Sequence, residues 1–249
     1  MSNEQKWSSF TGEKKLFMNE IHIWRVHLDR SDSAVQHFQQ ILSPDEVARA
    51  GRFHFEKDRR HWIIARGQLR WLLGQYLQIA PSLLRFRLNT YGKPLLDAPV
   101  DATNLFFNLS HSASLALYAF APTPAIGVDI EYMRSEIDIP ALAGISFSTN
   151  ERAALFQLLP EEQFYAFYRC WTSKEAYIKA RGMGLSLPLE QFDVELRPGQ
   201  PAALLQSREE ELQDVSDWSI YTLSPGKNYA GALAVKGKRW KVQFWQSEL

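Results

Sequence analysis

The chain has 249 residues, of which 45% are hydrophobic and 22% are charged, and its formal net charge is zero. This composition is typical of a globular protein with one large core or two smaller ones, and it argues against a generally basic nucleic-acid-binding protein. The single cysteine, Cys170, excludes a disulfide within the chain, and no apolar run approaches the roughly 18 residues of a membrane span. We therefore expect a cytoplasmic protein with neither a membrane segment nor a nucleic-acid partner.

The first part of the chain predicts a strand, a helix and a turn. Residues 1–19 are polar and poorly periodic, so we expect a flexible segment before a strand that begins at Ile21. Ser43 and Pro44, followed by two acidic residues, predict the start of a helix. The Tyr-Gly-Lys-Pro sequence at 91–94 predicts a turn, in which glycine permits close backbone approach and lysine supplies charge.

Two β-rich runs, 105–110 and 115–120, flank His-Ser-Ala-Ser and predict a hairpin. Its tip presents Ser110 and His111. Serine donates hydrogen bonds to phosphate from its hydroxyl, and protonated histidine donates from its ring. Because a histidine in a turn is more often solvated than functional, the hairpin does not assign a site by itself.

The segment from Ala125 to Ile130 is apolar except for Asp129 and rich in β-branched residues, which predicts a strand. Side chains alternate along a strand, so Asp129 and Glu131 share one face. Two adjacent carboxylates repel each other unless a cation lies between them, and oxygen ligands suit Mg²⁺. Without further context, two acidic residues at a strand end are more often solvated.

A stretch from Glu161 to Arg181 contains neither glycine nor proline and predicts a long amphipathic helix that ends at Gly182. Trp171, Glu175 and Lys179 are spaced four apart and therefore share one face. One interpretation is a surface Glu–Lys pair beside a half-buried tryptophan. The other, drawn with the acidic strand, is a third carboxylate at a metal and a lysine that meets a phosphate.

The end of the chain suggests an internal repeat. Residues 197–213 hold two prolines and an acidic run, which predicts turns and solvated surface, and 218–235 predicts a second hairpin. An Ala-Arg-Gly sequence at 65–67 recurs at 180–182, about 115 residues later, with a hairpin after each. These echoes favour two similar halves.

In order, these motifs resemble those of the Sfp-type 4'-phosphopantetheinyl transferases. That family has a G-K-P turn, an N-x-S-H-S hairpin, a G-[IV]-D-[IV]-E strand and a W-x-x-K-E-A-x-x-K helix. All four occur here between 91 and 187, and 49–72 is similar to the family's N-terminal basic helix region. The resemblance implies an α+β fold of two pseudo-symmetric halves, each a long helix packed on an antiparallel sheet, with the active site in the cleft between them.

The resemblance also implies the division of labour and the reaction. Residues 20–124 would bind the coenzyme A nucleotide, and 125–249 would carry the metal site and the docking surface for carrier proteins. The enzyme, expected to be a monomer, would use Mg²⁺ to transfer 4'-phosphopantetheine from coenzyme A to a serine of an apo acyl or peptidyl carrier protein, releasing adenosine 3',5'-bisphosphate.

The same resemblance assigns the site residues. The metal ligands are Asp129, Glu131 and Glu175. The catalytic residues are Glu175, as ligand, general base or both, and Lys179. The coenzyme A-binding residues are Arg49, Tyr91, Gly92, Lys93, Pro94, Asn108, Ser110 and His111.

One departure and two other functions remain. Glu46 stands where some relatives have a basic residue, so Arg60 or Arg66 are alternatives for holding the 3'-phosphate beside Arg49. A magnesium-dependent phosphohydrolase would release free phosphopantetheine without a carrier. A non-catalytic binding module has no need for the intact carboxylates and lysine of this chain.

The helix at 161–181 and the adjoining loop 183–188 are the candidates for carrier docking, because Met183, Leu185 and Leu187 alternate beside basic residues without an obvious core partner. The alternative is that these side chains cover the core.

Overall fold

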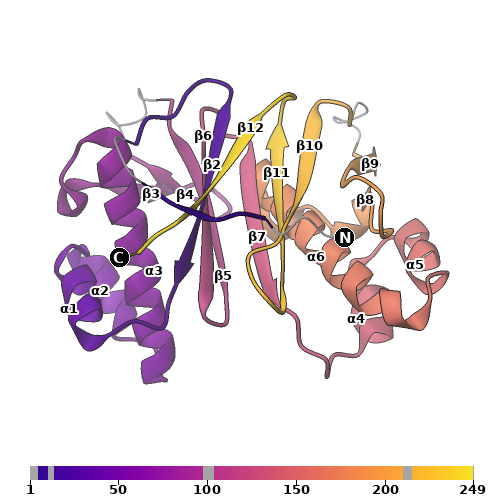
Figure 1. Cartoon of the computed structure of the whole chain (residues 1–249), viewed down its shortest axis with the longest axis horizontal. Coiled ribbons are helices and arrows are strands. Elements are labelled where there is room, and N and C mark those ends of the chain that lie inside the picture. Colours follow the sequence, from indigo (N-terminus) through magenta and orange to yellow (C-terminus); the bar gives the residue numbers. More distant parts are fainter. Residues whose placement is uncertain (1–4, 11–13, 98–103, 210–214, 249) are drawn as a thin grey trace.

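The computed structural model describes residues 5–10, 14–97, 104–209 and 215–248. Two β-sheets lie side by side in the middle of the molecule, with α1 to α3 outside one and α4 to α6 outside the other (Figure 1). The strands are β1 (Ser8–Ser9), β2 (Glu20–His27), β3 (Phe86–Leu88), β4 (Pro94–Leu96), β5 (Phe106–Ser112), β6 (Leu115–Ala121), β7 (Ile126–Tyr132), β8 (Phe192–Val194), β9 (Leu204–Ser207), β10 (Trp218–Leu223), β11 (Tyr229–Lys236) and β12 (Lys241–Gln246). The α-helices are α1 (Asp32–Gln40), α2 (Pro44–Ala50), α3 (Glu56–Leu77), α4 (Ile139–Ser146), α5 (Thr149–Phe156) and α6 (Pro160–Arg181).

The two central sheets differ in size and direction. Within the described ranges, one has five strands in the order β1-β12-β2-β6-β5, and the other has three in the order β10-β11-β7. The second is antiparallel, as predicted. The first is mixed, because the C-terminal strand β12 crosses back and pairs in parallel with both β2 and β1. The expectation of an antiparallel sheet in each half is therefore wrong for the first sheet.

Each half does contain one helix of 22 residues packed on its sheet, α3 in the first and α6 in the second. Their sheets do not match strand for strand, so the pseudo-symmetry of the halves is not confirmed. Both predicted hairpins form, as β5–β6 and β10–β11. Between the two hairpins in the sequence, β9 pairs with β8. The prediction of turns alone for 197–213 is therefore wrong over 204–207. Residues 210–213 lie outside the described ranges.

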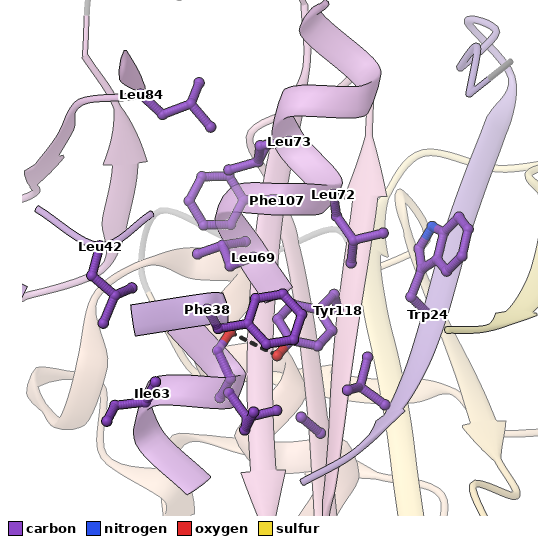
Figure 2. Close-up of a cluster of buried hydrophobic side chains, with 14 of the residues drawn as sticks. Trp24, Phe38, Leu42, Ile63, Leu69, Leu72, Leu73, Leu84, Phe107 and Tyr118 are labelled. Atoms are coloured by element: carbon purple, nitrogen blue, oxygen red, sulfur yellow. Dashed lines mark hydrogen bonds between the residues drawn. The ribbon is translucent and has the colours of Figure 1, made fainter. Parts of the chain in front are cut away.

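Three apolar cores separate the layers. In the first, large side chains of α3 such as Leu69 and Leu72 meet Trp24 and Tyr118 of the sheet, as Figure 2 shows. The Tyr118 hydroxyl donates to the carbonyl oxygen of Ala65 at 2.8 Å, which satisfies its only buried polar atom. The second core lies between α6 and the three-stranded sheet.

The third core joins the two sheets to each other. Along β6 and β11 its members alternate with buried residues of the other two cores, and they include Ile21, Ile23, Leu117, Val128, Ile130 and Leu233. Each is completely buried, and burying a side chain of this size stabilises the fold by about 1.5–3 kcal/mol. The two halves are therefore joined by apolar packing as well as by the chain itself.

The described part of the N-terminal segment is in contact with the first sheet. Ser8 and Ser9 pair with β12, and the Trp7 indole nitrogen donates to the carbonyl oxygen of Ser224 at 3.1 Å. Phe10 packs against Trp245, with 4.9 Å between ring centroids. These contacts give residues 5–10 partners that the sequence did not indicate, while the flexibility expected for 1–19 stays a prediction.

In the described ranges, no helix is long and apolar enough to cross a membrane.

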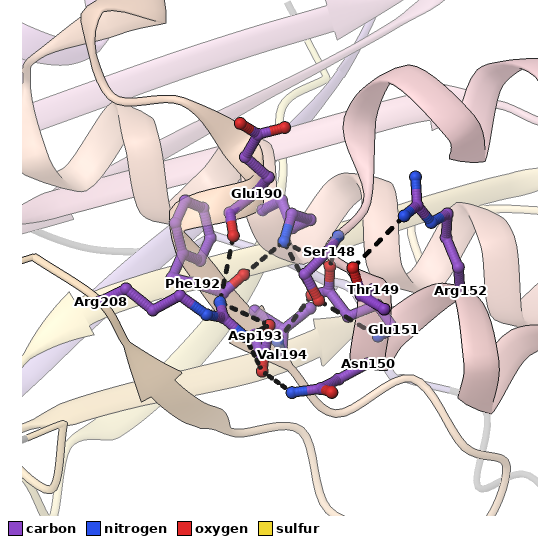
Figure 3. A network of polar contacts seen from close by, with 11 residues as sticks. Ser148, Thr149, Asn150, Glu151, Arg152, Glu190, Phe192, Asp193, Val194 and Arg208 are labelled. Atoms are coloured by element: carbon purple, nitrogen blue, oxygen red, sulfur yellow. Dashed lines mark hydrogen bonds and ion pairs between the residues drawn. The ribbon is translucent and has the colours of Figure 1, made fainter.

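Helix α6 is held on its outer side by a buried ion pair (Figure 3). The Lys174 ammonium contacts both carboxylate oxygens of Glu151, at 2.8 and 2.6 Å, and the carbonyl oxygen of Phe192 at 2.6 Å. Lys174 and Glu151 are 1% and 2% exposed. Because Glu151 also accepts from the Val194 backbone nitrogen, one carboxylate joins α5, α6 and β8.

On its inner side, α6 lies directly against β7 at Gly127. A Cβ atom built on Gly127 would lie 2.1 Å from the carbonyl oxygen of Ala176 and 2.3 Å from the nitrogen of Ala180. Real Cβ atoms do not approach backbone so closely. Glycine is therefore required here for close approach, and its φ angle is not the reason.

We predict that Gly127→Ala lowers the free energy of unfolding by at least about 2 kcal/mol and also lowers activity, because α6 must move away from β7. Denaturant unfolding measures the first effect. The matched control is Gly144→Ala in α4, where a Cβ meets nothing within 4 Å. That change should leave stability unchanged or raise it by up to about 1 kcal/mol. Equal unfolding curves for the two variants would contradict the close-approach argument.

Candidate active site

The site lies where α6 crosses β7, beside the β5–β6 hairpin. Asp129 of β7 is 2% exposed. Its Oδ1 accepts hydrogen bonds from the Ser110 hydroxyl at 2.9 Å and from the Lys179 ammonium at 2.6 Å. Its Oδ2 is buried and has no hydrogen-bond partner among the described residues. Such an orphaned carboxylate oxygen is costly unless another group completes it.

The carboxylates of Glu131 and Glu175 lie close enough to Asp129 for its negative charge to raise their pKa values. Burial and then the charge of Asp129 raise the pKa of Glu131, although the Ser112 hydroxyl donates to it at 2.9 Å. Burial, Asp129 and Glu131 likewise raise the pKa of Glu175 on α6, while Lys179 opposes them. The site therefore holds three acidic groups whose ionised forms destabilise one another.

Lys179 supplies the positive charge of this cluster. Its ammonium bonds Asp129 and, at 2.9 Å, the Ser110 hydroxyl, and its side chain is 28% exposed. The predicted alignment of Trp171, Glu175 and Lys179 along α6 is confirmed, since all three are half-buried on it.

With Lys179 against Asp129, the acidic groups do not form a ready metal centre. Across the described ranges, no group of three or more His, Cys, Asp or Glu side chains is arranged to hold a metal ion. The residue types nevertheless fit Mg²⁺, because they are oxygen donors that carry uncompensated negative charge. The buried, unpartnered Oδ2 of Asp129 is the atom of this structure that most clearly fits a cation.

A cavity of about 330 Å³ opens beside this cluster and collects several of the predicted coenzyme A-binding residues. Arg49, Gly92, Pro94 and His111 all line it. It is also lined by residues that were not assigned to the site: Asp45, Trp62, Ala65, Phe86, Leu88 and Leu109, together with Glu46 and Arg66. Ser110 and His111 are consecutive, so β5 places one side chain at the acidic cluster and the next at the cavity.

The cavity lining carries two arginines, Arg49 and Arg66, and two carboxylates, Asp45 and Glu46, and Glu46 is paired with Arg66. The Arg49 guanidinium lies 5.8 Å from the ring centroid of Trp62 and has no carboxylate partner among the described residues. The side chain of His111 reaches the surface, but the surrounding protein removes water from its ring, and this desolvation lowers its pKa. The charges of Lys179 and His61 lower the pKa further. An arginine without a carboxylate partner in a cavity is suited to an anion such as phosphate.

Of the two alternative arginines, only Arg66 lies at the cavity. It forms an ion pair with Glu46 and lies 4.1 Å from the ring centroid of Phe86. Arg60 instead donates to Asp32 at 2.5 Å and lines a different cavity. Glu46, which stands where some relatives have a basic residue, thus orients Arg66 through this ion pair.

Glu46 is itself held by two arginines. Its burial alone would raise the pKa of its carboxyl group, but the hydrogen bond from Arg70 and the charge of Arg66 outweigh burial and lower that pKa. Glu46 therefore stays ionised, and the local charge balance of the cavity depends on it.

Four predicted coenzyme A-binding residues do not line the cavity: Ser110, which lies at the acidic cluster, and Asn108, Tyr91 and Lys93. Asn108 is buried, and its side-chain oxygen accepts from the backbone nitrogen of Val128 at 2.8 Å, which joins β5 to β7. Tyr91 is 52% exposed and does not line the cavity. The ammonium of Lys93 is directed to backbone carbonyl groups.

Other residues differ from the sequence-based expectations. Leu187 is 3% exposed and Met183 packs on the same core cluster, so these two cover the core as the alternative interpretation had it. Ser112 was missed, although it bonds Glu131. Its position two residues after Ser110 on the same strand face was the available signal.

We predict that Glu175→Gln makes the metal-free protein more stable at about pH 7, with a thermal midpoint higher by about 2 °C. The folded protein raises the pKa of Glu175, so its ionised form destabilises the fold at neutral pH. This destabilisation decreases as the pH falls through the raised pKa, because Glu175 becomes protonated. The thermal midpoints of the variant and the wild type should therefore become equal near pH 4.

Thermal unfolding from about pH 4 to pH 8 tests this, with Glu56→Gln as the control. The exposed Glu56 has its pKa lowered by a hydrogen bond from Arg59, so neutralising it should bring no gain in stability. A less stable Glu175→Gln protein at neutral pH would contradict the mutual repulsion of the acidic groups.

Comparisons with known proteins identify the family of this chain. The model of the 4'-phosphopantetheinyl transferase superfamily matches residues 125–234, and the model of the 4'-phosphopantetheinyl transferase N-terminal domain matches 27–123. The 4'-phosphopantetheinyl transferase HetI of Nostoc sp. is 40% identical over 92% of this chain and 93% of its own length. Sfp of Bacillus subtilis is 33% identical over 70% of this chain and 76% of its own.

A more distant relative, the human L-aminoadipate-semialdehyde dehydrogenase-phosphopantetheinyl transferase, is 31% identical over 63% of this chain and 53% of its own length. The two family models together cover both halves of the fold, and the acidic cluster lies in the part matched by the superfamily model. The chain therefore belongs to the Sfp-type 4'-phosphopantetheinyl transferases and is a transferase enzyme of that family.

Proposed function

We propose that this transferase moves the 4'-phosphopantetheine group of coenzyme A to a serine hydroxyl of an apo acyl or peptidyl carrier protein and releases adenosine 3',5'-bisphosphate. The observation that carries the proposal is the orphaned oxygen of Asp129, within an acidic cluster beside a cavity in which Arg49 has no carboxylate partner among the described residues. An anionic nucleotide fits the cavity, and a divalent cation fits the cluster.

In this proposal, Asp129, Glu131 and Glu175 hold Mg²⁺. When bound, the ion neutralises charge on the pyrophosphate of coenzyme A and orients its β-phosphorus. The mutual repulsion that raises the pKa of Glu131 and Glu175 supports this assignment, because a cation removes it.

The chain's own residues move the proton and stabilise the leaving group. A bond forms between the carrier serine oxygen and the β-phosphorus, while the bond from that phosphorus to the oxygen bridging to the α-phosphate breaks. We assign Glu175 to accept the serine proton, directly or through water, in addition to its place at the metal. Lys179 stabilises the negative charge that the leaving bisphosphate gains.

The cavity binds the nucleotide end of coenzyme A. Arg49 is assigned to the 3'-phosphate because it has no carboxylate partner among the described residues, with Arg66 as its neighbour across the cavity. His111 and Ser110 are assigned to phosphate groups nearer the acidic cluster. Gly92 and Pro94 supply the wall at the nucleotide end.

The remaining expectations stay predictions: a cytoplasmic location, a monomer, carrier docking on the C-terminal half and the division into 20–124 and 125–249. Lys93, Asn108 and Tyr91 are not assigned to contacts with coenzyme A here, because their side chains neither line the cavity nor, as Ser110 does, bond a side chain of the acidic cluster.

We predict that Asp129→Asn reduces phosphopantetheine transfer by about a hundredfold or more and raises the Mg²⁺ concentration needed for half-maximal rate. The variant keeps the size of the side chain but removes its charge. Mass spectrometry of an apo carrier incubated with coenzyme A across a magnesium titration measures both effects. Asp217→Asn, at an exposed residue before β10, is the control.

An unchanged magnesium dependence in Asp129→Asn would contradict the metal assignment. Release of free phosphopantetheine without a carrier would instead identify a phosphohydrolase.

We predict that Arg49→Ala lowers kcat/KM for coenzyme A by about ten- to a hundredfold but barely changes it for dephospho-coenzyme A, which lacks the 3'-phosphate. A lost charge-assisted contact in a partly exposed cavity costs about 1.5–3 kcal/mol. Arg52→Ala is a matched control, because Arg52 lies outside the cavity. Equal damage with both substrates would exclude a contact between Arg49 and the 3'-phosphate.

A further inference from the structure

The side chain of Lys93 reaches from the first half of the molecule into the second. Its ammonium donates to the carbonyl oxygens of Ile126 and Lys179, both at 2.9 Å, and of Pro124 at 3.3 Å. A lysine ammonium has three protons, so these three acceptors use its whole donor capacity. It has no proton left for a phosphate unless this arrangement breaks.

Asn89, four residues earlier, makes a second connection to the same place. Its side-chain nitrogen donates to the carbonyl oxygen of Gly182 at 2.8 Å. Its side-chain oxygen accepts from the backbone nitrogens of Tyr91 at 2.9 Å and Lys93 at 2.8 Å, which fixes the turn itself. We call the contacts of Asn89 and Lys93 with Lys179 and Gly182 the clamp.

The clamp acts on the last turn of α6. The last carbonyl groups of a helix lack partners within it, and donors and cations there are stabilising. Here the partners come from a turn nearly ninety residues earlier in the chain. One of the clamped residues, Lys179, has its ammonium on Asp129. The clamp therefore holds the backbone of a residue whose side chain lies in the acidic cluster.

The same turn has a second face. Gly92 and Pro94 line the cavity, between and beside the clamp residues. A molecule in that cavity would touch the turn directly, and the turn touches α6.

We propose that Lys93 is a positioning residue, which together with Asn89 fixes the end of α6 on β7 and transmits occupancy of the cavity to Lys179 and Glu175. This role replaces the direct contact with coenzyme A that the family resemblance implied for its side chain. The transmission part rests on the proposed function, because it takes coenzyme A as the occupant of the cavity.

Burial lowers the pKa of Lys93 to about 8, so the ammonium is kept charged at neutral pH at a cost in stability. Replacing a buried charge with an apolar side chain of similar length is often neutral for folding. Lys93→Met should therefore yield a folded protein in which the clamp is lost. Asn89→Ala removes the other connection and serves as an independent second variant.

The kinetic test separates positioning from ligand contact. In Lys93→Met, kcat should fall about tenfold or more, while KM for coenzyme A changes less than about twofold, because a displaced catalytic group costs rate and not ground-state binding. A rise in KM for coenzyme A with unchanged kcat would show that Lys93 binds the substrate and would overturn the proposal. Lys241→Met, at an exposed lysine of β12, is the matched control.

Hydrogen exchange gives a readout that does not depend on transfer. In the metal-free, ligand-free protein, amides of residues 178–184 should exchange faster in Lys93→Met and in Asn89→Ala than in the wild type and Lys241→Met. Added coenzyme A should slow this exchange in the wild type and not in Lys93→Met. Unchanged exchange in both clamp variants would overturn the proposal.

The two proposals fail in different ways. If the wild type does not transfer phosphopantetheine from coenzyme A but the clamp variants still loosen 178–184, the proposed function fails and the clamp remains. If transfer proceeds and neither clamp variant alters exchange or kcat, the clamp fails and the proposed function remains.

Discussion

The contact between Gly127 and the backbone of α6 sets the distance on which the candidate site depends. Side chains usually separate a helix from a sheet, but here the helix backbone rests on the strand, with Ala176 and Ala180 as its small neighbours. This close approach brings the Cα and Cβ atoms of Glu175 and Lys179 near β7, so their side chains can reach the carboxylates of Asp129 and Glu131. A larger residue at 127 would push the helix backbone away from β7 and so lengthen the hydrogen bond from Lys179 to Asp129.

Helix α6 is held on its outer side as well as against β7. Lys174 faces away from β7 into the buried pair with Glu151, while the next residue, Glu175, faces the acidic cluster. Neighbouring residues of one helix thus carry a structural charge and a candidate catalytic charge on different faces. The Glu151 pair is complete, because both carboxylate oxygens have hydrogen-bond partners, whereas the Asp129 group retains an orphaned oxygen. This difference in completeness separates a structural network from a site that receives a ligand.

The sequence predicted the elements that depend on local chemistry. The strand at 126–132, the helix at 160–181 with Gly182 at φ +67°, and both hairpins follow from periodicity and turn residues. It could not predict that β12 joins the first sheet, because parallel pairing over such a separation leaves no local pattern. The same limit applies to the site. Spacing placed Asp129 beside Glu131, but the cavity wall of Trp62, Phe86 and Leu109 comes from three distant elements.

Lys93 shows why a motif does not by itself assign a role to each of its residues. A lysine beside a glycine in a phosphate-binding turn suggests a charge for the ligand, yet the side chain of this lysine points to the other face of its turn. The glycine and proline of the same turn do line the cavity. A turn has two faces, and sequence spacing in a turn does not say which face a long side chain takes, whereas the period of a strand or helix does. The ammonium of this motif therefore connects the two halves through backbone carbonyl groups, and the arginines that line the cavity are Arg49 and Arg66.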